Sequence, residues 1–211
     1  MELNNEERKQ ATNRITYWGV AVNLFLSVIK IFGGVIGQSQ ALLADGIHSV
    51  SDLASDAMVL VAAKHAGEDA DEDHPYGHAR YETLATVVLG LLLIGVAGGI
   101  AYDAILRLEN PSQIKTPALF TLIIAMISIL SNEGLYHATK AVAQKIRSPM
   151  LHANAWHHRS DAVSSIVVFA GIGATYLGYP LLDAIAAIIV ALMIGKIGLD
   201  LSRQSMQELV D

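Results

Sequence analysis

The sequence predicts an all-α membrane protein with six transmembrane helices, and three observations lead to this fold class. Of the 211 residues, 53% are hydrophobic and only 16% are charged, whereas soluble domains carry about 25% charged residues. Six stretches are long and apolar enough to cross a bilayer, and mostly short polar breaks separate them. The Lys and Arg residues outside these stretches collect in alternate breaks, as they do in multi-pass membrane proteins.

The six stretches follow one another along almost the whole chain. A transmembrane helix needs about 20 mostly apolar residues, and each stretch has this length. The second and fifth stretches are the least apolar. The predicted spans are residues 15–37, 41–65, 82–106, 117–140, 152–177 and 180–203.

The breaks between the spans read as turns. They include GQSQ at 37–40, ENPSQIKTP at 109–117 and LGYP at 177–180, which are rich in Gly, Pro, Ser and Asn. The segment from 66 to 81 is longer, acidic and carries two His. Short breaks make consecutive helices antiparallel neighbours.

The orientation in the membrane follows from the positive charges in the breaks. Lys and Arg are enriched on the cytoplasmic side of membrane proteins. One set of segments, which includes both ends of the chain, carries nine of them, and the opposite set carries only Arg107 and Lys115. We therefore expect both termini to be cytoplasmic, which agrees with an even number of spans.

The remaining composition excludes several classes of protein. The chain contains no Cys, so disulfides and thiolate metal sites are excluded. The net charge is −6 and no basic patch is present, so we expect no nucleic-acid partner. Residues 1–14 are polar and lack the apolar core of a signal peptide. We expect a cytoplasmic tail over 1–14 and a membrane domain over 15–203.

Two pentapeptides, HSVSD at 48–52 and HHRSD at 157–161, share the pattern His-x-x-Ser-Asp. Positions i and i+4 lie on one helix face, so His48 pairs with Asp52, and His157 with Asp161. A charged group inside a bilayer costs at least ~2.5–3.5 kcal/mol and normally faces a partner or a cavity. If the two helices meet, they supply two nitrogen and two oxygen ligands, a set that suits Zn²⁺. Imidazole also suits Fe²⁺, Co²⁺ or Ni²⁺.

Other interpretations of these pairs stay open. Each pair could be a helix-end cluster in which His and Asp bond to one another or to water at the membrane interface. A metal enzyme would also need an open ligand position, a general base and a substrate pocket. The sequence has neither the Glu-x-x-His pair of di-iron bundles nor the His-Glu-x-x-His motif of metalloproteases. We therefore expect no enzyme and no bound cofactor.

With these motifs, the sequence resembles the cation diffusion facilitators, a family of divalent-metal/proton antiporters. The resemblance spans nearly the whole chain. It rests on the six spans and on LLADGIHSVSDLASD in the second, DEDHPYGHARYE before the third and HANAWHHRSDAVSS entering the fifth. It implies that the transport site is formed by His48, Asp52, His157 and Asp161. His and Asp on both helices resemble the zinc-preferring branch.

The motif DEDHPYGH at 71–78 is a second candidate metal site. Two His and a carboxylate at short spacing can surround an ion, and the resemblance implies a loop site at Asp71, His74 and His78. Asp73 is the substitute if Asp71 is not a ligand. The alternative is a solvated acidic loop whose residues cap the third helix.

Further polar residues lie inside the spans. Asp45 precedes His48 by three positions. It is either a proton acceptor or accessory metal ligand, or else a carboxylate at the helix start near the outer interface. Lys30 either pairs with an acid or extends to the interface. His158 should point away from His157 and is expected to be a bystander, and Asp183 is a candidate buried polar group.

The expected function is efflux of a divalent metal cation by alternating access. Zn²⁺ is the first candidate substrate, with Fe²⁺, Cd²⁺ and Mn²⁺ as alternatives, and H⁺ is the counter-ion. A non-transporting metal sensor and a selective channel are the competing hypotheses. The resemblance implies a homodimer in the lipid bilayer of the inner (plasma) membrane or a membrane derived from it. It also implies that residues 204–211 begin a cytoplasmic C-terminal domain that this sequence lacks.

Overall fold

The computed structural model describes residues 5–65, 79–110 and 115–210, and six α-helices make up nearly all of this part of the chain. No strand occurs among the described residues. The prediction of an all-α fold with six helices is therefore confirmed. The helices are α1 (Asn5–Gly37), α2 (Gln40–His65), α3 (Ala79–Glu109), α4 (Leu119–Ile146), α5 (Pro149–Tyr176) and α6 (Leu181–Val210).

The helices extend beyond the apolar stretches at both ends of the chain. α1 begins at Asn5, ten residues before the predicted span, and α6 continues past residue 203 to Val210. The expected borders at 14/15 and 203/204 are therefore not helix ends. The flanking residues are rich in Glu, Arg, Lys and Gln, which are good helix formers. Hydropathy marks the part of a helix that suits the bilayer, and it does not mark where the helix stops.

Among the described residues, four helices, α1, α3, α4 and α6, are long and apolar enough by composition to cross a membrane. α2 and α5 are the two stretches that the sequence ranks as least apolar. α2 packs against α1, α3, α5 and α6, and α5 packs against α2, α4 and α6. Because other helices cover so much of their surfaces, these two can carry polar side chains that a lipid-facing helix could not.

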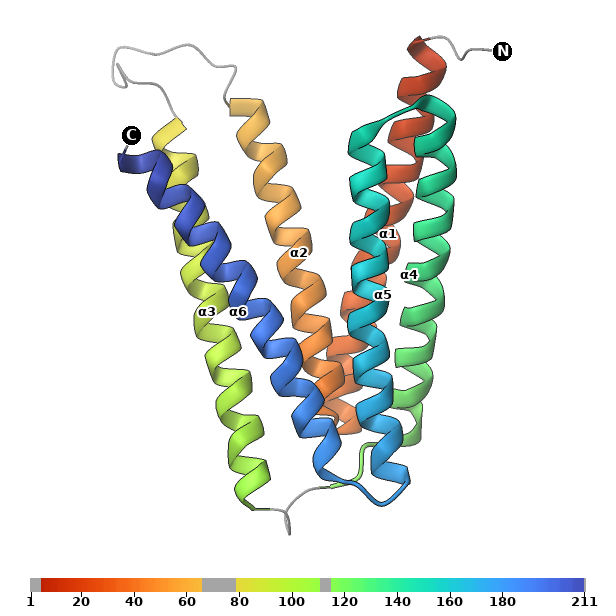
Figure 1. The fold of residues 1–211 in the computed structure, drawn as a ribbon, viewed down its shortest axis with the longest axis vertical. Helices are drawn as coiled ribbons and strands as arrows, with labels where there is room; N and C mark the ends of the chain where they lie inside the picture. The colour runs from red at the N-terminus through yellow and green to blue at the C-terminus, as the bar shows by residue number, and fades with distance from the viewer. Residues whose placement is uncertain (1–4, 66–78, 111–114, 211) are drawn as a thin grey trace.

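The helices divide into two groups (Figure 1). α3 lies along α6 on one side, α1, α4 and α5 lie together on the other, and α2 runs between them. Both ends of the chain lie at the same end of the molecule, and the α2 and α5 ribbons diverge towards that end. Six antiparallel passes account for the shared position of the termini.

The main apolar core lies towards the opposite end. It includes Leu42 at the start of α2, Val168 and Ile172 late in α5, and Val190 and Ile194 in the first half of α6. All five side chains are buried. This core holds α2, α5 and α6 together at the end remote from the termini.

The α1–α2 connection is tight. Gln38 adopts a left-handed conformation with φ 58°, and the Ser39 amide donates back to the Gly34 carbonyl at 3.0 Å. The Ser39 hydroxyl then accepts from the Leu42 amide at 3.1 Å and so caps α2. A Cβ on Gly34 would lie only 2.7 Å from the Leu43 Cα, so only Gly lets the two backbones approach this closely.

Asp183 ties the start of α6 to the start of α2. Its carboxylate accepts from the Ser39 hydroxyl at 2.7 Å and from the Gln40 amide at 2.9 Å. Both bonds are buried, and a carboxylate at a helix N-terminus is favoured by the helix dipole. The sequence singled out Asp183 as a buried polar group, and the structure gives its partners.

Replacing Gly34 by Ala should lower stability by about 1–3 kcal/mol, the usual cost of overpacking. The added methyl would meet the Leu43 backbone, which cannot rotate away as a side chain can. Thermal unfolding of purified protein in detergent measures the effect. Gly95→Ala is the matched control, because nothing lies within 4 Å of its added Cβ. Ala at position 95 should stabilise the helix by ~0.5–1 kcal/mol relative to Gly. Equal stability changes in the two variants would contradict the packing argument.

Candidate metal site

The first half of the candidate site lies on α2. His48 and Asp52 are one helical turn apart, and His48 Nδ1 lies 3.7 Å from Asp52 Oδ2. The two side chains are only 6% and 11% exposed. The i,i+4 spacing places both on one face of the helix, as the sequence predicts. This face is the one that α2 turns towards α5.

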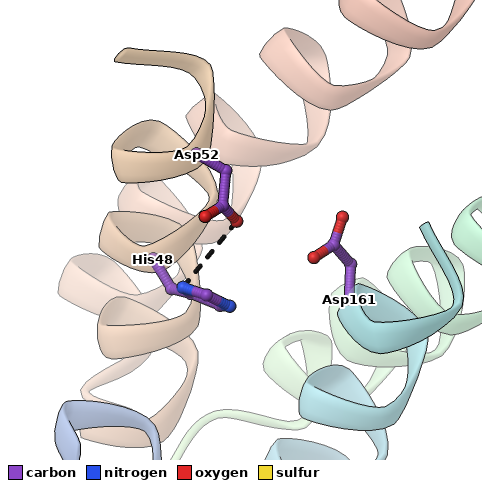
Figure 2. Close-up of side chains that lie close together, drawn as sticks. All are labelled: His48, Asp52 and Asp161. Atoms are coloured by element: carbon purple, nitrogen blue, oxygen red, sulfur yellow. Dashed lines mark ion pairs between the residues drawn. The ribbon is translucent and has the colours of Figure 1, made fainter. Parts of the chain in front are cut away.

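Asp161 of α5 completes a three-residue cluster. One ligand atom from each of His48, Asp52 and Asp161 lies within 4.8 Å of the other two. Figure 2 shows the Asp161 carboxylate pointing across from α5 towards the two side chains of α2. Two helices that are more than a hundred residues apart in the sequence therefore bring one imidazole and two carboxylates together.

Two buried polar atoms of this cluster have no hydrogen-bond partner. His48 Nδ1 and Asp52 Oδ2 are buried and accept or donate no hydrogen bond. An unpartnered buried polar atom costs about 1–3 kcal/mol, and more for a charged group. A cation between the three side chains would satisfy these atoms. Tetrahedral Zn²⁺ needs ligand atoms about 3.4 Å apart, so binding would draw the cluster slightly closer together.

His157, the fourth predicted ligand, lies beside the cluster and is not part of it. Its Nε2 is 3.8 Å from Asp161 Oδ2, and its side chain is 39% exposed. His158 is instead buried, with its ring against α1, where a Cβ on Gly19 would lie 3.3 Å from its Nε2. The two rings therefore point in different directions, and His158 is outside the cluster.

Asp45 is also separate from the three-residue cluster. It is completely buried, and its Oδ2 lies 2.8 Å from Lys30 Nζ. Its two carboxylate oxygens accept from Ser164 and Ser165 of α5 at 2.9 and 3.0 Å. Asp45 therefore already has partners in this conformation, and it is the acid that pairs with Lys30.

Sequence reasoning missed the three serines that surround this ion pair. Ser164 and Ser165 follow Asp161 by three and four positions, so they share its helix face. Ser49 follows His48 directly, and its hydroxyl accepts from Lys30 Nζ at 3.2 Å. The helical spacing from Asp161 could have drawn attention to Ser164 and Ser165. Serine is too common near helix interfaces to be selected on that ground alone.

The predicted loop site lies outside the described residues. This applies to Asp71, His74 and His78 and to the substitute Asp73. The loop site stays a prediction.

The comparison with known proteins identifies the family of the chain. The sequence matches the cation efflux transmembrane domain family over residues 17–210. The chain belongs to this family. Its six helices therefore form the membrane domain of a multi-pass membrane protein, in agreement with the resemblance stated from the motifs.

Relatives of this cation efflux domain come from distant organisms. It is 37% identical to metal tolerance protein C1 of Arabidopsis thaliana, over 92% of this chain and 44% of that protein. It is 35% identical to metal tolerance protein 2 of Oryza sativa subsp. japonica, over 96% of this chain and 58% of that protein. It is 34% identical to the manganese efflux system protein MneP of Bacillus subtilis, over 97% of this chain and 71% of that protein. The chain thus spans only about half of the two plant proteins.

Removing Asp161 should abolish tight metal binding. Asp161→Ala takes away the only ligand that α5 contributes to the cluster, so Zn²⁺ affinity should fall by more than the ~10–100-fold typical of a lost outer-shell partner. Titration calorimetry on purified protein in detergent measures the change.

His137→Gln is the control for this substitution. His137 forms an i,i+4 pair with Glu133 at 3.3 Å, like the pair on α2, but the pair belongs to no three-residue cluster of the described residues. Equal losses in the two variants would show that isolated His–carboxylate pairs, and not the α2–α5 cluster, bind the metal.

Proposed function

We propose that this cation efflux domain exports a divalent metal cation, with Zn²⁺ as the first candidate substrate. The observation that carries the proposal is the buried cluster of His48, Asp52 and Asp161, in which His48 Nδ1 and Asp52 Oδ2 have no hydrogen-bond partner. Its two carboxylates would balance the charge of a divalent ion. Thiolates are absent from the chain, which favours an ion that can leave over a permanent structural zinc.

The nitrogen ligands support Zn²⁺ and Fe²⁺ as substrates. Imidazole shifts the preference of a site away from Mg²⁺, Ca²⁺ and Mn²⁺. A second candidate is Mn²⁺ or a broad range of ions, since two of the three clustered residues are carboxylates and one relative is named for manganese efflux. Comparing Zn²⁺, Fe²⁺, Cd²⁺ and Mn²⁺ in one assay separates these candidates.

Protons are the proposed counter-ion. The His ligands bind metal only when neutral and the Asp ligands only when ionised, so metal binding releases protons. Histidine changes its charge between about pH 5 and 8, so protons compete with metal at physiological pH. An inward proton gradient would then drive the metal outwards, and metal binding should weaken as the pH falls from about 7 to 5.

We propose that the metal enters the site from the end of the bundle that carries the termini. We place both termini on the cytoplasmic side, because the Lys and Arg residues collect there. The main apolar core packs α2, α5 and α6 together at the other end of the bundle. In this conformation the metal would enter from the cytoplasm, and a rearrangement of α2 and α5 would release it outside.

Transport is the decisive test of this function. Protein reconstituted in liposomes should move Zn²⁺ when a proton gradient is imposed, and Asp161→Ala protein should not. A metal-sensitive dye inside the liposomes measures the flux. Binding without flux in the wild type would favour a membrane metal sensor, and flux that ignores the pH gradient would favour a channel.

His157 should become the fourth ligand when metal binds. It lies beside Asp161 and needs only to turn towards the cluster. X-ray absorption of the zinc-loaded protein should show two imidazole ligands. His157→Gln should leave one and weaken Zn²⁺ binding by at least about tenfold. An unchanged spectrum in this variant would remove His157 from the site and leave a three-residue cluster.

A further inference from the structure

Lys30 of α1 lies in a complete set of hydrogen-bond partners. Its ammonium group lies 2.8 Å from Asp45 Oδ2 and 3.2 Å from the hydroxyl oxygens of Ser49 and Ser165. An ammonium group has three N–H donors, so each donor has an acceptor. The Lys30 side chain is only 1% exposed, and its charge is therefore compensated inside the protein.

Both oxygens of the Asp45 carboxylate also have hydrogen-bond donors. Ser164 donates to Oδ1, and Ser165 and Lys30 donate to Oδ2. The network joins three helices, with Lys30 from α1, Asp45 and Ser49 from α2, and the two serines from α5. A buried polar network in which every member is satisfied holds its members in one arrangement.

This network adjoins the metal cluster on the side away from the termini. Asp45 lies one helical turn before His48 on α2, and Ser164 lies one turn after Asp161 on α5. The Ser164 hydroxyl also lies 2.9 Å from the Asp161 carbonyl oxygen. Asp45 is thus the next carboxylate along the face of α2 that bears the candidate ligands, and it is the one that the protein supplies with a cation of its own.

The net charge of the metal cluster differs from that of the neighbouring Lys30–Asp45 network. Asp52 and Asp161 together carry two negative charges, which balance a divalent ion. Asp45 would add a third negative charge and more oxygen ligands, but Lys30 cancels that charge. A buried ion pair is seldom more stabilising than apolar side chains of the same volume, so stability alone does not account for Lys30 and Asp45.

We propose that Lys30 is a specificity-determining residue of the metal site, acting through Asp45. By pairing with Asp45, it keeps that carboxylate and the serine hydroxyls out of the shell of the bound ion. The site then keeps a balanced set of nitrogen and oxygen ligands, which favours Zn²⁺ over ions that prefer oxygen, such as Mn²⁺. This inference rests on the proposed metal-binding function of the cluster.

The test is the ratio of the Mn²⁺ and Zn²⁺ dissociation constants, measured by titration calorimetry on the full chain in detergent. In Lys30→Met, Asp45 is free to act as an extra ligand. Ligand charge tunes the affinity for hard cations over orders of magnitude, so Mn²⁺ binding should improve at least about tenfold relative to Zn²⁺. Lys196→Met, which removes an exposed lysine of α6, should leave the ratio unchanged.

Two further variants separate selectivity from folding. Asp45→Asn leaves the Lys30 charge uncompensated beside the cluster, so both ions should bind more weakly without a change in their ratio. The double variant Lys30→Met/Asp45→Asn removes both charges and should restore the wild-type ratio. A merely structural role would make the double variant at least as defective as the single ones.

The outcomes separate a failure of the proposed Lys30 role from a failure of the proposed metal site. A wild-type protein that binds neither ion would overturn the proposed metal site itself. If the wild type binds Zn²⁺ but folded Lys30→Met keeps the wild-type ratio, only the role of Lys30 is overturned. If Lys30→Met does not fold, Lys30→Gln replaces it, because it removes the charge paired with Asp45 and keeps N–H donors for Asp45 and the serines. A ratio that does not move towards Mn²⁺ in that variant overturns the proposal.

Discussion

The cost of a polar group without a partner inside a bilayer is the constraint on which this structure depends. Charged and hydrogen-bonding side chains must either leave the membrane or find partners within the bundle. The outward faces of the helices are accordingly apolar, with exposed side chains such as Leu91, Leu130 and Leu192. The buried ion pair of Lys30 and Asp45 and the cluster that includes His48 and Asp161 lie where α1, α2 and α5 meet. The helices that are least apolar by sequence are therefore the ones that carry the candidate metal ligands.

Two sets of polar side chains lie next to one another where these helices meet. They differ in whether all of their hydrogen-bonding atoms have partners. The Lys30–Asp45 network satisfies its own donors and acceptors. The cluster of His48, Asp52 and Asp161 leaves buried atoms without partners. A complete network fixes helices in place, and an incomplete one is ready to accept a ligand. We propose that the complete network holds the helices and that the incomplete cluster binds the metal, and the two lie about one turn apart along α2 and α5.

Helices that contribute no ligand to the cluster still position it. Asp183 at the start of α6 accepts from the first residues of α2, and Gly34 lets α1 approach α2 closely. These contacts lie at the end remote from the termini, where the main apolar core also lies. The half of α2 nearest this end is therefore held on several sides, and the rotation of the face that bears His48 and Asp52 is set there.

The sequence by itself determined the six helices, their order and the two helix faces that bear His and Asp. Those features follow from local periodicity and from the bilayer, which both act on residues close in the chain. Only the tertiary structure decided that Asp161 meets the α2 pair, that His157 lies beside the cluster, and that Lys30 pairs with Asp45. These contacts join residues that are far apart in the chain, such as Lys30 and Ser165, and they depend on how the helices rotate against one another. Apolar patterning identifies which face turns inwards but not which side chain on a neighbouring helix it meets.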